Sequence, residues 1–408
     1  MEPGSRRVSP PGCAFRDWRL RRKAYVGPMA ARTVRKALYW TEKRWDRVRF
    51  RIKRKLDMLG TPILLPFAGM AGAEGVWIRG RVIEDNGAIS APPTRSLFEN
   101  IKLTFKRYET DEIADARIFW EIGDKKGETR TDIEGYFDLL IDIDPESLDK
   151  PVDFARIELG KAPGYERAQA PIGAELPIRV VSSRAEYGVI SDIDDTIVET
   201  GAFNLVKHWR TVVANSAETR TAFPGVSHFY RALARGADGA MTNPVFYVSS
   251  SPWNLYDLFE RFLVIHDIPR GPLFLKDFGL DATKWLTGGH DGHKTKQIER
   301  IFRAYPHLNF LLIGDSGQDD GRIYADIAAA HPGRVLQVHI RDVTKGILKS
   351  HITNGIDELR ALNIPVTLAP TLYEAARAAG DAGLITEAEV AEVRADVAER
   401  ERRGEAPE

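Results

Sequence analysis

The segment Tyr187-Gly-Val-Ile-Ser-Asp-Ile-Asp-Asp-Thr-Ile197 decides the fold prediction, because an apolar run suited to a buried strand ends there in three aspartates and a threonine. α/β proteins place their functional groups at the carboxyl edge of a parallel sheet, where such strands end. Asp192 and Asp194 are two residues apart, so an extended chain directs both side chains to one side. Neighbouring carboxylates are costly unless a cation binds with them. The segment therefore predicts a cation site at a strand end, with a charged loop as the plain alternative.

Strand and helix patterns alternate on the carboxyl side of this segment. Apolar runs of strand length are followed by segments of helix length, which is typical of an α/β protein with a doubly wound parallel sheet. We expect strands at 187–192, 244–249, 273–275, 309–314 and 334–340, and helices at 226–235, 252–266, 293–304 and 320–330. Residues 183–367 should form this domain, and residues 368–408 a helical tail rich in Ala, Glu and Arg.

The region upstream has the period-two pattern of β-strands. Residues 75–83, 101–108 and 116–122 alternate apolar and polar side chains, and Asp124-Lys-Lys-Gly127 is a turn signal. Strands at this spacing with polar turns favour a smaller antiparallel, β-sandwich-like domain at 61–182. Its sequence contains no catalytic cluster, so we expect a binding or scaffolding role.

Charge is unevenly distributed along the chain. The 408 residues have no net charge, but residues 1–57 hold 18 Lys or Arg and 5 Asp or Glu, a net charge of +13. We expect residues 1–32 to be disordered, and residues 33–60 to form a basic amphipathic helix that either lies on an anionic membrane surface or packs on the protein. Nucleic acid is not expected as a partner, because no recognition motif accompanies the charge. A single cysteine excludes an internal disulfide, and no apolar run is long enough to span a bilayer.

Two further motifs supply groups that suit a phosphate. The apolar strand Val245-Phe-Tyr-Val-Ser249 ends in a hydroxyl, which can donate a hydrogen bond to a phosphate oxygen. His293-Lys294-Thr-Lys296 begins a predicted helix, where a lysine can reach the phosphate and offset the aspartates. Each feature alone has a simpler explanation, strand capping for Ser249 and solvation for the lysines, so the order of the motifs carries the prediction.

The last motif is a second strand that ends in carboxylates, Phe310-Leu-Leu-Ile-Gly-Asp315-Ser-Gly-Gln-Asp319-Asp320. Mg²⁺ takes oxygen ligands in an octahedron, usually one or two carboxylates with phosphate and water. Asp192 and Asp315 are therefore the first predicted ligands of Mg²⁺. The backbone carbonyl of Asp194, and either Asp320 or Asp319, complete the predicted metal site.

These motifs in this order resemble the haloacid dehalogenase (HAD) phosphotransferase superfamily. In finer detail, residues 187–345 resemble the actin-patch-associated phosphatidate phosphatase family, which is related to the lipins. The resemblance rests on Ser191-Asp-Ile-Asp-Asp-Thr-Ile197, Tyr247-Val-Ser-Ser-Ser-Pro-Trp-Asn-Leu-Tyr256, Gly271-Pro-Leu273, His293-Lys294 and Gly314-Asp-Ser-Gly-Gln-Asp-Asp320 with Tyr324.

The resemblance implies an HAD-like (Rossmannoid) fold and Mg²⁺-dependent hydrolysis of phosphatidate to diacylglycerol. Asp192 would be the nucleophile that forms an aspartyl phosphate, and Asp194 the acid and base, with Ser249 and Lys294 on the phosphate. The family's last carboxylate stands five residues after the first of its motif, which selects Asp320 over Asp319.

The spacing of the motifs predicts an open site without a cap domain. About fifty residues separate Asp194 from Val245, and about forty separate Ser251 from His293, which leaves room for little beyond a flap at 200–224. An open site suits a lipid headgroup at a bilayer surface, and we expect a cytoplasmic protein, peripheral on the inner membrane surface. The alternatives are a phosphatase for another phosphomonoester or a phosphoprotein, and a non-catalytic module that binds anionic phospholipid.

Overall fold

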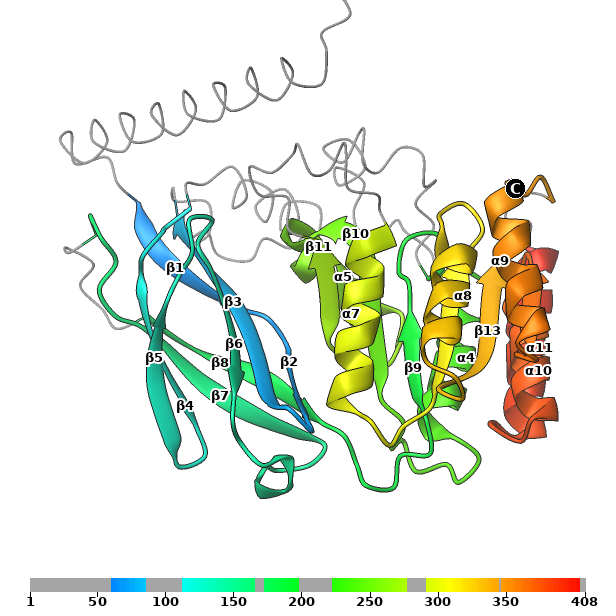
Figure 1. The fold of residues 1–408 in the computed structure, drawn as a ribbon, viewed down its shortest axis with the longest axis horizontal. Coiled ribbons are helices and arrows are strands. Elements are labelled where there is room, and N and C mark those ends of the chain that lie inside the picture. The colour runs from blue at the N-terminus through cyan, green and yellow to red at the C-terminus, as the bar shows by residue number, and fades with distance from the viewer. Residues whose placement is uncertain are drawn as a thin grey trace, which may run out of the picture. The chain divides into compact units, whose positions relative to one another are not determined.

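The computed structural model describes residues 60–85, 112–165, 172–197, 222–276, 291–344 and 346–403. In these residues the chain forms two sheets, one composed of strands from 61–180 and one of strands from 188–369, with helices around the second (Figure 1). The helix predicted in 33–60 and almost all of the flap predicted at 200–224 lie outside the described residues. None of the described helices has the length and apolar character needed to cross a membrane.

The first sheet has eight strands in the order β1-β3-β2-β8-β7-β4-β5, with β6 on β3. Period-two burial explains why these residues form strands: in β7, Ala155, Ile157 and Leu159 are buried and alternate with exposed side chains. The strands are β1 (Thr61–Pro66), β2 (Gly69–Gly72), β3 (Gly75–Asp85), β4 (Arg117–Ile122), β5 (Lys125–Arg130), β6 (Tyr136–Ile141), β7 (Val152–Leu159) and β8 (Ile172–Val180), with a 3₁₀ turn η1 (Pro145–Ser147) before β7.

The prediction of a purely antiparallel sheet is wrong in one pairing. β2 runs parallel to β8, while the other described pairs of this sheet are antiparallel. The sheet is therefore mixed, and its hydrogen-bonded path is continuous. A period-two pattern indicates which face of a strand is buried, but it contains no information on the direction of the partner strand.

The second sheet is parallel throughout and has the order β11-β10-β9-β12-β13-β14. All residues of β9 and β12 are buried, as expected for central strands covered on both faces. The strands are β9 (Gly188–Ser191), β10 (Val245–Pro252), β11 (Leu273–Lys276), β12 (Phe310–Asp315), β13 (Val335–Arg341) and β14 (Val366–Ala369). The predicted doubly wound parallel sheet is thus confirmed as an α/β architecture.

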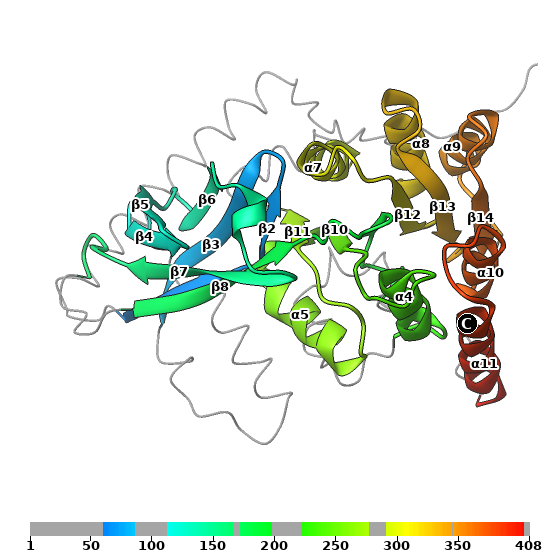
Figure 2. The ribbon, with the colours of Figure 1, turned by 90° about the horizontal axis from the view of Figure 1, so that it is seen from below.

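Helices cover both faces of the parallel sheet. Figure 2 shows α7 and α8 on one face and α4 and α5 on the other. The helices are α4 (Val226–Arg235), α5 (Tyr256–Ile265), α7 (Asp291–Ala304), α8 (Asp320–Ala330), α9 (Ser350–Ala361), α10 (Tyr373–Asp381) and α11 (Glu387–Arg402), and the short turn η2 (Trp253–Leu255) precedes α5.

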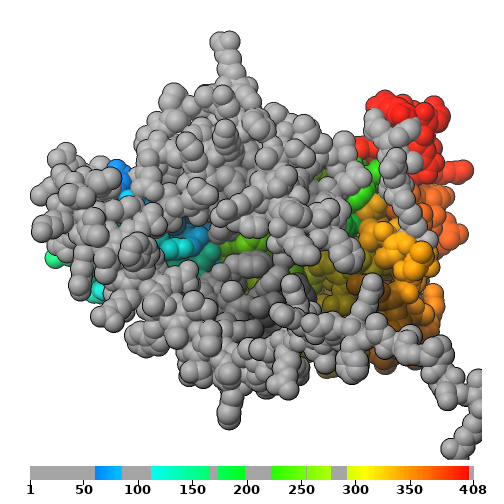
Figure 3. Space-filling view, turned by 90° about the horizontal axis from the view of Figure 1, so that it is seen from above, coloured from blue at the N-terminus to red at the C-terminus, as the bar shows by residue number. Residues whose placement is uncertain are grey.

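The predicted C-terminal tail is helical and belongs to the packed body. Asp396 of α11 accepts a hydrogen bond from the backbone N–H of Gly225 at 2.7 Å, and Arg400 donates one to the carbonyl of Ala222 at 2.8 Å. Val393 is fully buried. The gold, orange and red atoms of the segments from α8 to α11 lie next to one another in Figure 3.

The two sheets share one hydrophobic core, and several aromatic rings lie at the contact between them. Phe67, which follows β1, stacks on Trp253 with 4.7 Å between ring centroids. The guanidinium of Arg79 in β3 lies 4.7 Å from the centroid of the same Trp253 ring. The backbone N–H of Ala68 donates to the hydroxyl of Tyr256 at 2.7 Å. The first sheet is therefore packed directly against the residues that follow the end of β10.

Candidate active site

Strand register explains how motifs far apart in the sequence meet. Ser191, the last residue of β9, pairs with Tyr247 of β10 on one side and with Ile313 of β12 on the other. Asp192 follows Ser191 directly, while Ser249 and Asp315 each lie two residues beyond its partners. The three motifs therefore end at the same carboxyl edge of the sheet, where α/β proteins place their functional groups.

The structure brings the six predicted site residues into one buried cluster. Ligand oxygens of Asp192, Asp315 and Asp320 lie within 4.8 Å of one another, and these side chains have no exposed surface. Lys294 at the start of α7 places its Nζ 2.9 Å from Asp192 Oδ1 and 2.5 Å from Asp320 Oδ1. The competing Lys296 is exposed, so the geometry separates the two lysines.

Asp320 and Asp319 have different surroundings. Asp320 Oδ2 accepts the backbone N–H of Asp315 at 3.2 Å, an approach that Gly314 allows because a Cβ there would lie 2.4 Å from this oxygen. Asp319 points away and pairs with His351 of α9 at 2.6 Å, with about a third of its side chain exposed. Asp320 is thus the member of the pair that belongs to the cluster.

Two serines hold the carboxylate of Asp194. Asp194 Oδ2 accepts hydrogen bonds from Ser249 Oγ at 2.6 Å and from Ser251 Oγ at 2.8 Å. Ser249 Oγ also accepts the backbone N–H of Ser251 at 2.9 Å, which fixes the turn after β10. Ser249 was predicted to face a phosphate; in the structure its hydroxyl is directed at Asp194. The role of Ser251 was not predicted.

Three carboxyl groups of the site, those of Asp192, Asp194 and Asp315, have a raised pKa. Burial raises the pKa of Asp192 well above its usual value, and the nearby carboxylates add to this, while Lys294 opposes it. Burial also raises the pKa of Asp194 and that of Asp315, the latter to about 7. Burial alone would lower the pKa of Lys294, but the surrounding carboxylates raise it, so the lysine stays charged.

The donor set fits a hard divalent cation. Carboxylate and carbonyl oxygens are the protein ligands that Mg²⁺ takes. Asp192 Oδ2, Asp315 Oδ2 and the backbone carbonyl of Asp194 converge on a common point, since one amide nitrogen, that of Gln318, lies 3.2–3.4 Å from all three. Lys294 alone cannot balance the carboxylates of the cluster, so a further positive charge would be favourable.

Two more residues of the site could not be inferred from residue type. Gln318, in the loop after β12, contacts the cluster through its side-chain amide. Arg341, at the end of β13, is buried and donates from Nη1 to the carbonyl of Asp195 at 2.7 Å. The guanidinium of Arg341 also lies 3.2 Å from the ring centroid of Phe223. The backbone of Asp195 is left-handed, with a φ of 56°. Arg341 thus fixes the loop that contains Asp194.

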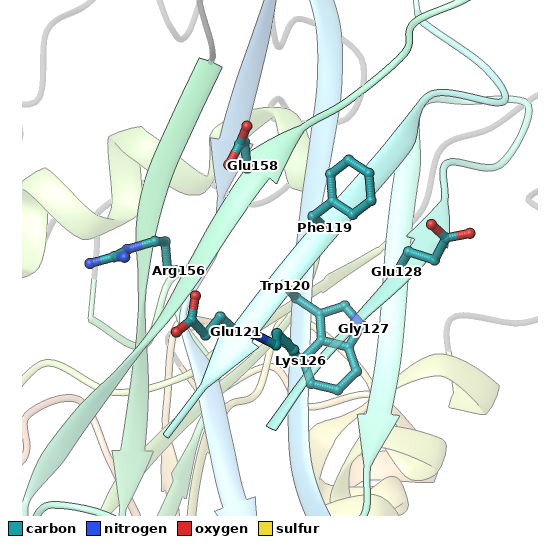
Figure 4. Close-up of a pocket in the computed structure, with 8 residues that line it drawn as sticks. All are labelled: Phe119, Trp120, Glu121, Lys126, Gly127, Glu128, Arg156 and Glu158. Carbon is teal, nitrogen blue, oxygen red and sulfur yellow. The ribbon is translucent and has the colours of Figure 1, made fainter. Parts of the chain in front are cut away.

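A pocket of about 330 Å³ lies elsewhere, on the first sheet between β4, β5 and β7 (Figure 4). Its acidic and basic side chains are mixed, and none belongs to the carboxylate cluster. The pocket therefore offers no obvious catalytic chemistry. Its lining residues are Phe119, Trp120, Glu121, Lys126, Gly127, Glu128, Arg156 and Glu158.

The fold and the site together form a parallel α/β sheet that presents clustered carboxylates, a buried lysine and serine hydroxyls at one edge, an arrangement that suits a phosphate group and a divalent cation. The family comparison agrees with this arrangement, because residues 187–342 match the model for "Phosphatidate phosphatase APP1, catalytic domain". Over this segment the family resemblance found in the sequence is confirmed.

Two relatives show how far the similarity extends. Phosphatidate phosphatase APP1 of Saccharomyces cerevisiae is 31% identical over 172 residues, which are 42% of this chain and 28% of that protein. An uncharacterized protein of Schizosaccharomyces pombe is 27% identical over 256 residues, 61% of this chain and 40% of that protein. The chain thus spans less than half the length of either relative.

Structural similarity adds nothing to this assignment. A carbohydrate acetylesterase from Xanthomonas citri matches 77% of this chain and 69% of its own, with 11% identity and a TM-score of 0.27. A likeness of this size carries no conclusion about fold or activity.

Proposed function

We propose that this chain is a Mg²⁺-dependent phosphatase with a capless HAD-like fold, which hydrolyses phosphatidate to diacylglycerol and phosphate through an aspartyl phosphate. One observation carries the proposal: Asp192 and Asp194 lie in one buried cluster, the first beside Lys294 and the second beside two serine hydroxyls. The environments differ in the way that a nucleophile and an acid require. The match to phosphatidate phosphatase APP1 supports the substrate.

In the proposed mechanism the chain's own residues attack phosphorus, neutralise the charge of the phosphate and transfer a proton. A carboxylate oxygen of Asp192 attacks phosphorus, and the bond from phosphorus to the lipid oxygen breaks. Lys294 offsets the charge of the phosphate. Asp194 gives its proton to the departing oxygen and later takes one from the water that hydrolyses the aspartyl phosphate; its raised pKa supports this role. Asp192, Asp315, the Asp194 carbonyl and Asp320 would hold Mg²⁺, which supplies charge neutralisation.

Membrane attachment and domain division are part of the same proposal. The net charge of +13 in residues 1–57 supports a basic helix at 33–60 that holds the enzyme on the anionic, cytoplasmic surface of a membrane. The proposed divisions are 1–32, 33–60, a β domain at 61–182, the catalytic domain at 183–367 and a helical tail at 368–408.

A phosphate-release assay on the purified full-length chain tests the activity. Phosphatidate in mixed micelles is compared with soluble phosphomonoesters and a phosphopeptide, each with and without Mg²⁺. We expect Mg²⁺-dependent release from phosphatidate, lost in an Asp192→Asn protein that still unfolds cooperatively and is therefore folded. Faster release from a soluble ester or a phosphopeptide would assign the alternative substrate, and normal release by Asp192→Asn would refute the nucleophile.

A non-catalytic module would give a different result in the same assay. Such a protein binds phosphatidate vesicles but releases no phosphate under any of these conditions. The presence of both aspartates in the cluster argues against this alternative.

A further inference from the structure

The side-chain amide of Gln318 lies on the oxygens assigned to the cation. Its Nε2 is 3.2 Å from Asp192 Oδ2, 3.2 Å from Asp315 Oδ2 and 3.4 Å from the backbone carbonyl of Asp194. These are three acceptors from two strand ends, β9 and β12. An NH₂ group, which carries partial positive charge and two hydrogens, is the part of the amide that three acceptors attract.

The loop that carries Gln318 is anchored by Asp315 itself. Asp315 Oδ1 accepts the backbone N–H groups of Gly317 at 2.6 Å and of Gln318 at 3.0 Å. One oxygen of Asp315 therefore fixes the turn, and the other receives the side chain that this turn directs back over the cluster. Asp315 therefore determines where the amide of Gln318 lies, because it holds both the turn and the side chain.

The amide and a cation would compete for the same lone pairs. A divalent cation needs the three oxygens as close ligands, and the positive end of the amide would be repelled by it. The amide contacts are longer than strong hydrogen bonds, so a cation can displace them.

We propose that Gln318 is a built-in placeholder for the cation: its NH₂ group satisfies the three oxygens until the cation displaces it, and this competition weakens cation binding. This inference rests on the proposed cation dependence. It goes beyond that proposal because it says that one neutral side chain, Gln318, sets the affinity of the site for the cation.

Two substitutions at Gln318 test the placeholder. Gln318→Leu removes the competing N–H groups, so Mg²⁺ should bind about three- to tenfold tighter, while the melting temperature in chelator falls because three oxygens lose their donor. Gln318→Lys replaces the weak donor by a permanent cation, so the melting temperature in chelator should rise and the response to Mg²⁺ should disappear.

The readouts are the Mg²⁺ dissociation constant from titration calorimetry and the Mg²⁺-induced shift in melting temperature, both on the full-length protein. Gln297→Leu and Gln297→Lys in α7 make the same chemical changes outside the acidic cluster and should bind Mg²⁺ like the wild type.

Each outcome decides between the two proposals. If the wild type binds Mg²⁺ but Gln318→Leu binds it more weakly, the amide is a ligand, and the placeholder is refuted while the cation site stands. If Gln318→Leu and Gln318→Lys both bind Mg²⁺ like the wild type, the placeholder is also refuted. If the wild type itself gives no heat and no thermal shift with Mg²⁺, both the cation-dependent function and the placeholder fail.

Discussion

Replacing Lys294 by methionine should destabilise the protein strongly when no divalent cation is present. The side chains of Lys294, Asp192 and Asp320 are at most 2% exposed, so the charges have almost no solvent to compensate them. Removing one partner of a buried ion pair costs about 3–5 kcal/mol, because the other charge is left uncompensated. Such a loss lowers the melting temperature of a domain of this size class by about 6–20 °C. Methionine preserves the length and the apolar stem of the lysine side chain, so the loss of stability would come from the missing charge.

The effect should shrink on acidification. Burial raises the pKa of Asp192 and of Asp315, so the folded protein binds protons more readily than the unfolded chain. The contribution of these two carboxyl groups to stability therefore rises as the pH falls below about 7, and it does so more steeply once Lys294 is gone. Unfolding by urea in chelator at pH 8 and at pH 5.5 measures the difference.

The control is Lys296→Met, two residues away on the exposed side of the same helix. It should change the free energy of unfolding by less than about 0.5 kcal/mol. A Lys294→Met protein as stable as Lys296→Met at pH 8 would refute the electrostatic account of the cluster.

Three further predictions concern other parts of the fold. Asp194→Asn should reduce phosphate release by about 10²–10⁴-fold, without lowering the melting temperature, and undiminished release would exclude Asp194 as the acid. Burial lowers the pKa of His339 to about 3, so below about pH 6.5 the unfolded state takes up the proton first and stability falls by up to about 1.4 kcal/mol per pH unit. His339→Leu should flatten this slope in denaturant titrations at pH 7.5 and 5, and an unchanged slope would contradict it. Gly355→Ala places a Cβ 2.5 Å from the carbonyl oxygen of Gly321 across the contact of α8 and α9; it should cost about 1–3 kcal/mol in chemical unfolding, whereas Gly292→Ala, which meets no atom within 4 Å, should not.

The parallel sheet could be predicted closely because its strands are continuous apolar runs bounded by functional motifs. The strand predicted at 309–314 is observed at Phe310–Asp315, and the helices predicted at 226–235 and 320–330 have the observed bounds. The meeting of the site residues was also predictable, since all parallel strands end at one edge. The parallel pairing of β2 with β8 could not be predicted, because contacts between residues distant in sequence determine which strands pair.

The site residues that were not predicted from the sequence were missed for a different reason. Gln318 and Arg341 act through the direction of a long polar side chain, which depends on the turn or strand end that carries it. Residue type alone gives no such direction, because glutamine and arginine are also ordinary surface residues. Ser251 is similar, since three consecutive serines offer no basis for choosing among them.

The stacking of Phe67 on Trp253 limits how the chain can be divided into fragments. Trp253 stands two residues after Ser251 and is 4% exposed, and Phe67 after β1 and Arg79 of β3 both lie against its ring. A fragment trimmed to the matched segment 187–342 would lack both contacts and expose more of this indole, next to the turn whose Ser251 bonds to Asp194. The segment that matches the family model and the segment that keeps this packing intact are therefore not the same stretch of chain.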